Sequence, residues 1–182
     1  MSTAQRDALA DAAAAQAARG DADAFATLCR LLQDDVWRYC QALLGDPHLA
    51  QEAAQETFLR AVTAIRRFRG GCPARVYLLV IARRCCSAML RRETRHRHQT
   101  IDVTEPSHDG HAGTVETQLL LRGLPLDQRQ AFVLTQLLGL TYDEAAEVAG
   151  CRVGTIRSRV FRARERLVAT LTEVDLELAD AH

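Results

Sequence analysis

Apolar residues recur at helical spacing through the first part of the chain. One such seam runs through residues 48–68 at intervals of four, three, four and three, formed by Ala54, Phe58, Ala61, Ile65 and Phe68. A similar pattern begins after Asp21 or Asp23, either of which can cap a helix, and ends at Gly45-Asp46-Pro47. A strongly apolar centre at 76–82 lies within a third helix, expected over 74–95. These patterns predict three consecutive amphipathic helices.

A second group of helical patterns follows near the C-terminus. Glycine, proline and short polar turns separate helices expected over 117–123, 126–138, 141–149 and 153–171. Thr141 and Glu144 have the spacing of a capping box, which marks the start of the third of these helices. Between the two groups, residues 99–115 are polar and acidic, contain Pro and Gly, and show no helical period.

The composition agrees with an all-α chain of two small helical bundles joined by a flexible linker. Ala, Leu, Arg, Glu and Gln are abundant and favour helices, whereas the chain has only 10 Gly and 4 Pro. We therefore expect five segments along the chain. They are an Ala-rich lead at 1–20, a first domain at 21–98, an acidic linker at 99–115, a second domain at 116–171 and an acidic tail at 172–182.

Charge is strongly segregated although the formal net charge is zero. Residues 60–98 contain 11 Arg and one acid, Glu93, and residues 152–166 contain six Arg and one acid, Glu165. The alternative is a set of solvated helix faces with salt bridges, but these two blocks hold almost no acids that could pair with the arginines. The pattern favours two surfaces that bind a polyanion, with nucleic acid as the leading candidate.

The segment 141–167 has the spacing of a helix-turn-helix, with small residues where two helices cross and Gly150 at the turn. Val153, Ile156, Val160, Ala163 and Leu167 form the expected buried seam of its second helix. The opposite face holds Thr155, Ser158, Phe161 and Arg162, flanked by Arg157 and Arg159 and preceded by Arg152. In a major groove, Arg can read guanine and Phe can contact thymine methyl groups; alternatively, Phe161 packs on a neighbouring helix.

The sequence GTIRSRVFRARERL, together with LPLDQRQAFVLTQLLGLTYDEAAEVAG before it, resembles region 4 of extracytoplasmic-function sigma factors. In that family this helix reads the −35 promoter element. The resemblance implies that Arg157, Ser158, Phe161 and Arg162 match the family's DNA contacts. The full set of residues expected to contact −35 DNA is Arg152, Thr155, Arg157, Ser158, Arg159, Phe161 and Arg162.

The face opposite the seam of 48–68 shows Glu52, Glu56 and Leu59, with Gln55 at its edge. An exposed leucine among acids indicates a partner surface or an ordinary solvated face with one stray leucine. QETFLRA resembles the region-2.2 motif that docks on the clamp helices of the polymerase β′ subunit. The resemblance implies a core-binding surface of Glu52, Gln55, Glu56, Phe58 and Leu59, although Phe58 also lies in the seam.

The stretch FRGGCPARVYLLVIARRCCSAMLRRETRHR resembles regions 2.3 and 2.4, which melt and hold the −10 element. Melting needs a pocket for an unstacked base, expected in the loop at 69–75, and arginines that grip the separated strand. The residues expected to contact −10 DNA are Arg69, Arg75, Tyr77, Arg83, Arg84, Ser87 and Arg91. The family commonly has R-T-W-L where this chain has Arg75-Val76-Tyr77-Leu78, so the role of Tyr77 is an open question.

The resemblance implies a promoter-recognising subunit whose partners are core RNA polymerase, through the β′ clamp helices and the β flap, and promoter DNA. Members of the family are often held inactive by an anti-sigma factor, but no residue here identifies one. The sequence predicts no enzyme activity, cofactor, metal site, small-molecule substrate or membrane segment. It predicts a cytoplasmic location.

Six cysteines lack C-x-x-C spacing, and four fit helical patterns as small apolar residues. The alternatives are a DNA-binding regulator that acts without polymerase and an interaction module that sequesters other factors.

Overall fold

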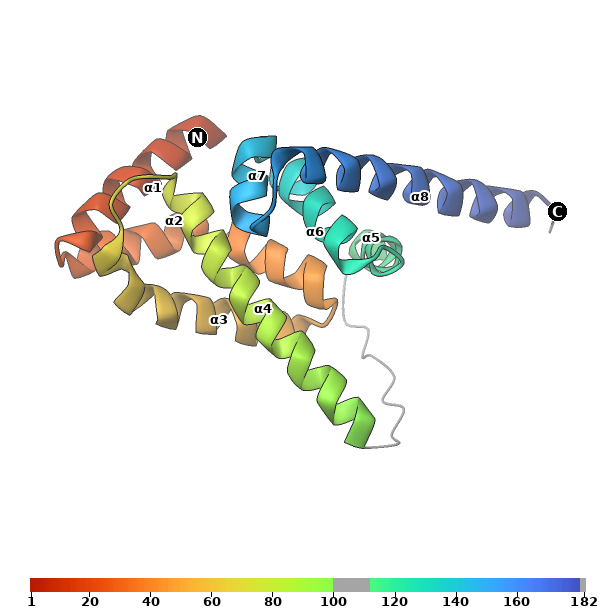
Figure 1. Cartoon of the computed structure of the whole chain (residues 1–182), viewed down its shortest axis with the longest axis horizontal. Helices are drawn as coiled ribbons and strands as arrows, with labels where there is room; N and C mark the ends of the chain where they lie inside the picture. Colours follow the sequence, from red (N-terminus) through yellow and green to blue (C-terminus); the bar gives the residue numbers. More distant parts are fainter. Residues whose placement is uncertain (100–111, 181–182) are drawn as a thin grey trace. The chain divides into compact units, whose positions relative to one another are not determined.

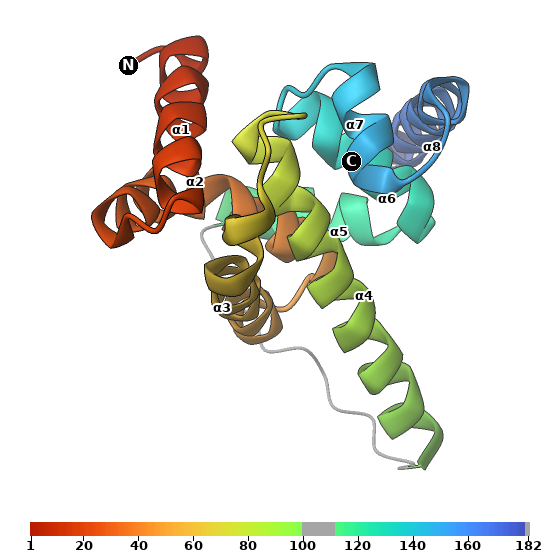
Figure 2. The same cartoon turned by 60° about the vertical axis from the view of Figure 1, so that its left-hand side comes forward.

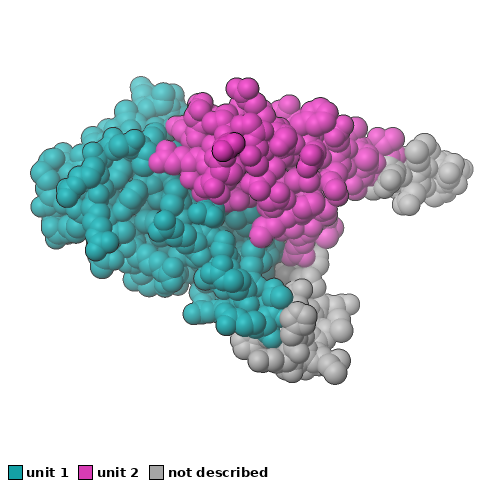
Figure 3. Space-filling model, viewed as in Figure 1, with its two compact units in different colours: residues 1–105 teal, residues 106–182 magenta. Residues whose placement is uncertain are grey.

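The computed structural model describes the backbone of residues 1–99 and 112–180 and the side chains of residues 1–95 and 117–172. The described backbone is helical with no strand, and it divides into two compact units, residues 1–105 and 106–182 (Figure 3). These findings confirm the predicted all-α fold with two helical bundles. Residues 100–111, the centre of the predicted linker, lie outside the described residues.

Unit 1 is a bundle of four helices in which α2 packs against the other three (Figures 1 and 2). Local signals explain the helix ends. Asp21 caps α2 through the backbone N–H of Ala24 at 2.9 Å, and Gly45 ends α2 in the left-handed conformation at φ 71°. The helices are α1 (Thr3–Ala18), α2 (Ala22–Leu44), α3 (Pro47–Ala64), the short 3₁₀ helix η1 (Ile65–Arg67) and α4 (Ala74–Gln99).

The Ala-rich lead expected at 1–20, either a frayed helix or a disordered segment, contains helix α1. Ala10, Ala13, Ala14 and Ala17 are buried, so the helix packs its small residues into the bundle. Ser2 begins the helix with a capping box that includes Gln5. Residues 3–18 therefore belong to the first bundle.

Unit 2 builds a smaller core around the first turns of its last helix. Ile156, Val160 and Ala163 of that helix are buried, as the spacing predicts, while Val153 and Leu167 are half-buried. The elements are α5 (Ala112–Arg122), α6 (Leu126–Phe132), the π-helical turn η2 (Val133–Leu137), α7 (Tyr142–Ala149) and α8 (Val153–Asp180).

Two boundaries differ from the sequence-based prediction. Helix α5 begins at Ala112, so its first turn occupies residues that the sequence assigned to the linker. Helix α8 continues to Asp180, so most of the expected acidic tail extends the helix and does not follow it (Figure 1). Polar and acidic residues can occupy a helix without an apolar period, which is why periodicity alone set both boundaries too short.

Candidate nucleic-acid and partner surfaces

Helices α7 and α8 form the predicted helix-turn-helix. The Thr141 hydroxyl accepts the Glu144 N–H at 3.2 Å, and the Glu144 carboxylate accepts the Thr141 N–H at 2.8 Å, which completes the capping box. Gly150 takes φ 67° at the turn, and Ala145 and Ala146 are buried where the helices meet. This turn places the first residues of α8 on the surface of unit 2.

The outward face of α8 presents an aromatic ring among cations. Phe161 is 62% exposed, which rules out the alternative in which its ring is buried against a helix of its own bundle. Arg157, Ser158 and Arg162 are exposed around it, and Thr155 is half-buried. The Ser158 hydroxyl donates to the Thr155 carbonyl at 3.0 Å, so it remains an acceptor towards solvent. Such a face can contact base edges and phosphates together.

Arg159 takes a different position from its neighbours on α8. Its Nε lies 3.1 Å from Asp127 Oδ2, its Nη1 lies 3.7 Å from Cys151 Sγ, and its side chain is only 25% exposed. The ion pair directs the guanidinium towards α6 and neutralises part of its charge. Of the residues expected to contact −35 DNA, Arg159 is therefore paired within unit 2, whereas Arg152 is exposed.

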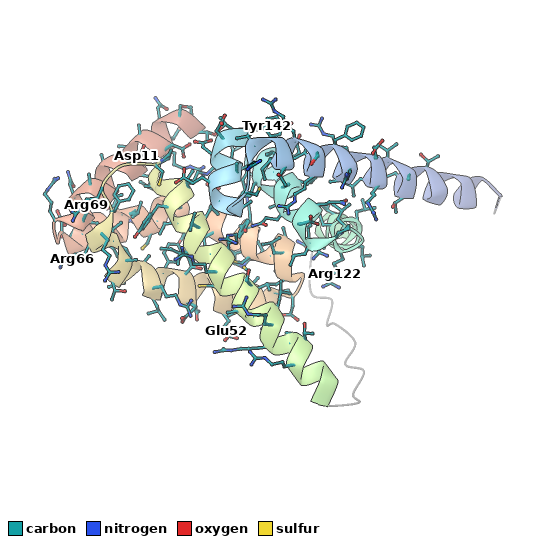
Figure 4. The ribbon with its side chains drawn as sticks, in the orientation of Figure 1. Asp11, Glu52, Arg66, Arg69, Arg122 and Tyr142 are labelled. Atoms are coloured by element: carbon teal, nitrogen blue, oxygen red, sulfur yellow. The ribbon has the colours of Figure 1, made fainter. Side chains whose placement is uncertain are left out.

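The outer face of α3 carries a patch of exposed apolar side chains. Leu59 is 67% exposed and Val62, one turn further on, is 51% exposed; Glu52 and Gln55 are exposed on the preceding turns. Figure 4 labels Glu52. We call Glu52, Gln55, Leu59 and Val62 the α3 patch. Sequence reasoning missed Val62, although its helical spacing from Gln55 and Leu59 could have revealed it.

Two other predicted residues of α3 sit at the margin of this patch. Glu56 Oε1 accepts the Arg60 Nε–H at 2.6 Å, an exposed i,i+4 ion pair that contributes about 0.3–0.5 kcal/mol. Phe58 is half-buried, consistent with its place in the seam. Arg60 therefore lies beside a surface that otherwise offers acids and apolar groups.

The residues expected to bind −10 DNA divide between surface and core. Arg69, Arg84 and Arg91 are exposed, and Arg83 and Ser87 are half-buried (Figure 4 labels Arg69). The four arginines supply cations along the loop after η1 and along α4, and a surface that holds a phosphate backbone requires such cations.

Arg75, which is also expected to contact −10 DNA, is buried in unit 1. Its side chain is 8% exposed, and its Nε lies 2.6 Å from Asp35 Oδ2 of α2. Asp35 also accepts from Arg6 of α1 at 2.8 Å, and Asp7 lies 3.9 Å from Arg75. Arg75 is thus part of an ion network that joins α1, α2 and α4.

Tyr77 is held by two contacts within unit 1. Its hydroxyl donates to the Ala64 carbonyl at 2.7 Å, and its ring meets Phe68 edge to face with centroids 5.2 Å apart. Burial raises the pKa of the Tyr77 phenol, so it stays a hydrogen-bond donor at neutral pH. Through these contacts with Ala64 and Phe68, Tyr77 supports the start of the loop after η1. This packing role explains an aromatic residue at position 77 without a contact to DNA.

The cysteines pack as apolar residues. Cys40 of α2 and Cys85 and Cys86 of α4 are buried, and all six thiols are free. A hydrogen bond with Cys86, together with burial, raises the pKa of the Cys40 thiol. Among the described side chains no group of three or more His, Cys, Asp or Glu residues is arranged to hold a metal ion. Within the described backbone, no helix is long and apolar enough to cross a membrane.

Comparisons with known proteins agree with this division into two units. Residues 28–96 match the family described as Sigma-70 region 2, and residues 114–167 match Sigma-70, region 4. The "ECF RNA polymerase sigma factor SigC" of Mycobacterium tuberculosis is 44% identical over 96% of this chain and 97% of its own length. EcfG of Rhodopseudomonas palustris, also an extracytoplasmic-function sigma factor, is 34% identical over 71% of this chain and 75% of its own length.

Two solved structures are similar to most of this chain. Sigma factor RpoE of Bartonella quintana, in complex with the anti-sigma factor NepR, aligns with a TM-score of 0.75 at 27% identity and covers 81% of this chain and 96% of that one. CnrH, in complex with the cytosolic domain of CnrY, aligns with a TM-score of 0.74 at 25% identity over 91% of this chain and 98% of that one. The chain belongs to the extracytoplasmic-function group of the sigma-70 family, the promoter-recognising sigma factors of RNA polymerase.

Proposed function

We propose that this sigma factor recognises the −35 element through α8 and binds core polymerase through the α3 patch. The observation that carries the first assignment is the exposed Phe161 ring, set between Arg157 and Arg162 on a helix that follows a tight turn. An aromatic side chain left in solvent by its own bundle and surrounded by cations fits a groove that offers thymine methyls, guanine edges and phosphates.

The second assignment rests on the charge and exposure of α3. Leu59 and Val62 expose apolar surface beside Glu52 and Gln55, and such a patch suits a basic partner helix with an apolar ridge. The clamp helices of β′ are the partner that the family supplies, and the β flap is the expected partner of unit 2.

The −10 element is assigned to the loop after η1 and to α4. Arg69, Arg83, Arg84, Ser87 and Arg91 lie on or near the surface of these segments and would hold the separated strand. The loop leads directly into α4, and Arg83, Arg84 and Arg91 lie along that helix, so one continuous segment would supply both the base pocket and the phosphate contacts. In this proposal the chain catalyses no reaction itself, needs no cofactor, works in the cytoplasm, and can be held inactive by an anti-sigma partner of the kind seen with RpoE.

Two single substitutions test the core-binding surface and the DNA-binding surface separately. Leu59→Arg should weaken binding of the chain to core polymerase about tenfold or more, because a central apolar contact is worth roughly 1–2 kcal/mol or above. Arg162→Ala should leave core binding intact and weaken promoter binding by the holoenzyme, since a good base contact is worth about 1–3 kcal/mol. Gln33→Arg, an exposed change on α2, is the matched control for added charge.

The measurements are core binding by fluorescence anisotropy of the labelled chain and run-off transcription from promoters selected by the holoenzyme. If the wild-type chain neither binds core nor directs a promoter-specific transcript, the proposed function is wrong. Tight binding of the chain alone to a duplex operator, with no effect of core, would favour the rival reading of a regulator that works without polymerase.

A further inference from the structure

Helix α1 packs against both elements that flank the loop of residues 68–73, namely η1 and α4 (Figures 1 and 2). The loop holds Gly70 and Gly71, and no atom of the described residues lies within 4 Å of a Cβ added at either position. A glycine pair without packing neighbours loses much conformational freedom when it becomes ordered. The order of this loop therefore depends on how firmly its two ends are held.

The N-terminus of α4 receives its capping side chain from another helix. Pro73 precedes α4, and its carbonyl accepts the first helical hydrogen bond from the Tyr77 N–H at 3.0 Å, but a proline side chain offers no oxygen. Asp11 of α1, 63 residues away in sequence, supplies one, since its Oδ1 accepts the Ala74 N–H at 2.7 Å. A carboxylate at this place also interacts favourably with the positive end of the helix dipole.

The second residue of α4 is held from the same side. Arg75 lies 2.6 Å from Asp35 of α2, and the Asp35 carboxylate also binds Arg6 of α1 at 2.8 Å. Two consecutive residues of α4 are thus joined to α1, Ala74 through Asp11 and Arg75 through Asp35. Polar contacts therefore fix the start of α4 to α1.

The other end of the loop meets the chain just after α1. Gly20 takes φ 108°, and a Cβ added there would lie 2.7 Å from Nη1 of Arg66 in η1 (Figure 4 labels Asp11 and Arg66). The Arg66 guanidinium therefore packs against the bare backbone of Gly20. Helix α1 and the turn that follows it contact the chain on both sides of the loop.

We propose that Asp11 is a positioning residue for promoter opening: by capping α4 from α1, it keeps residues 68–73 ordered before DNA binds. A loop that is already ordered loses less conformational entropy on binding, so the opened strand binds more tightly. Asp11 acts through the Ala74 N–H and does not itself contact DNA. This inference rests on the proposed function, in which the loop and α4 hold the −10 element, and it adds a role for α1.

Hydrogen exchange followed by mass spectrometry on the full chain measures the order of the loop. Asp11→Ala removes the cap and should speed exchange in residues 68–77 about fivefold, the scale of one helix cap. Asp11→Asn keeps an oxygen for the Ala74 N–H, so its exchange should stay within about twofold of the wild-type rate. Asp34→Ala is the matched control, because Asp34 is an exposed acid of α2, and it should leave exchange in the loop unchanged.

Promoter opening by holoenzyme assembled from the same chains is the second measurement, followed by the fluorescence of an aminopurine base placed in the −10 element. Asp11→Ala should lower the equilibrium constant for opening about fivefold, and Asp11→Asn should restore it. Core affinity and exchange in α3 should match wild type in all three variants. A general loss of stability would change these two quantities as well.

Three results would overturn the inference: unchanged exchange in the loop of Asp11→Ala, equal defects in Asp11→Ala and Asp11→Asn, or exchange in α3 that rises as much as in the loop. A loop that exchanges faster in Asp11→Ala while its holoenzyme opens the promoter as wild type does would also overturn it. In each case the wild-type holoenzyme still opens the promoter, and the proposed function stands. If the wild-type chain fails to bind core or to open a promoter, the proposed function itself fails.

Discussion

Asp35 is the residue on which the joint packing of α1, α2 and α4 most depends. It is 3% exposed and holds two arginines, with Arg75 at 2.6 Å and Arg6 at 2.8 Å. Asp35→Ala would remove the carboxylate that lies 2.6 Å from the buried Arg75 guanidinium, whereas the Asp7 carboxylate lies 3.9 Å from it. Breaking a buried pair by removing one member costs about 3–5 kcal/mol, so we expect the free energy of unfolding of unit 1 to fall by about that amount.

Urea unfolding followed by tryptophan fluorescence measures this change in unit 1, because Trp37 of α2 is the one tryptophan of the chain. Asp34→Ala is the control, since Asp34 is the adjacent acid and is exposed. It should change the free energy by less than about 0.5 kcal/mol. A cost below about 1 kcal/mol for Asp35→Ala would show that the network does not hold the bundle together.

At the scale of elements, two glycines near the turn of the helix-turn-helix have opposite expected effects. Gly150 takes φ 67°, where a side chain costs about 1–2 kcal/mol, so Gly150→Ala should lower the melting temperature of unit 2. Gly154 lies within α8, with no atom within 4 Å of an added Cβ, so Gly154→Ala should leave stability unchanged or raise it by up to about 1 kcal/mol.

Thermal unfolding by circular dichroism compares the two variants, and promoter binding adds a second readout. If α8 enters a groove at its N-terminus, the methyl group of Gly154→Ala should weaken promoter binding while the fold keeps its stability. Gly150→Asn should cost less than Gly150→Ala, because asparagine tolerates the left-handed region. Equal melting temperatures for Gly150→Ala and wild type would contradict the assigned turn geometry.

The elements also show what sequence reasoning could reach. The seam of α3 was readable because Ala54, Ala61 and Ile65 contrast with polar neighbours, and all three are buried. The packing of α1 into the bundle was not predicted, because an alanine-rich helix has little hydrophobic contrast, although Ala10, Ala13, Ala14 and Ala17 fall at helical spacing.

The site was predictable only where a residue's environment is local. The exposure of Phe161 follows from its position on α8, because Ile156, Val160 and Ala163 place the buried face on the other side of the same helix. Arg75 and Arg159 owe their positions to Asp35 and Asp127, which lie far away in sequence. A run of arginines gives no sign of which member finds an acid in another helix, so charge alone overstated the surface available to DNA.

For the whole molecule, segregation of charge matters more than the net charge of zero. A neutral chain without segregation would bind DNA weakly and with little dependence on salt. Here six arginines with one acid occupy residues 152–166, so binding of promoter DNA should weaken steeply as salt rises. Ion pairs within the fold reduce the number of cations that contribute, because an arginine already neutralised by a carboxylate releases fewer counterions from DNA.

Arg157 and Arg159 make this argument testable on one helix. Arg157 is exposed, whereas Arg159 pairs with Asp127 at 3.1 Å. Measured as the slope of log affinity against log salt for holoenzyme on a promoter duplex, Arg157→Ala should reduce the magnitude of the slope by about 0.9, the value for one phosphate contact. Arg159→Ala should reduce it by clearly less. Equal losses from the two substitutions would mean that Arg159 leaves Asp127 to contact DNA when the complex forms, and the neutralising role of the ion pair would then be wrong.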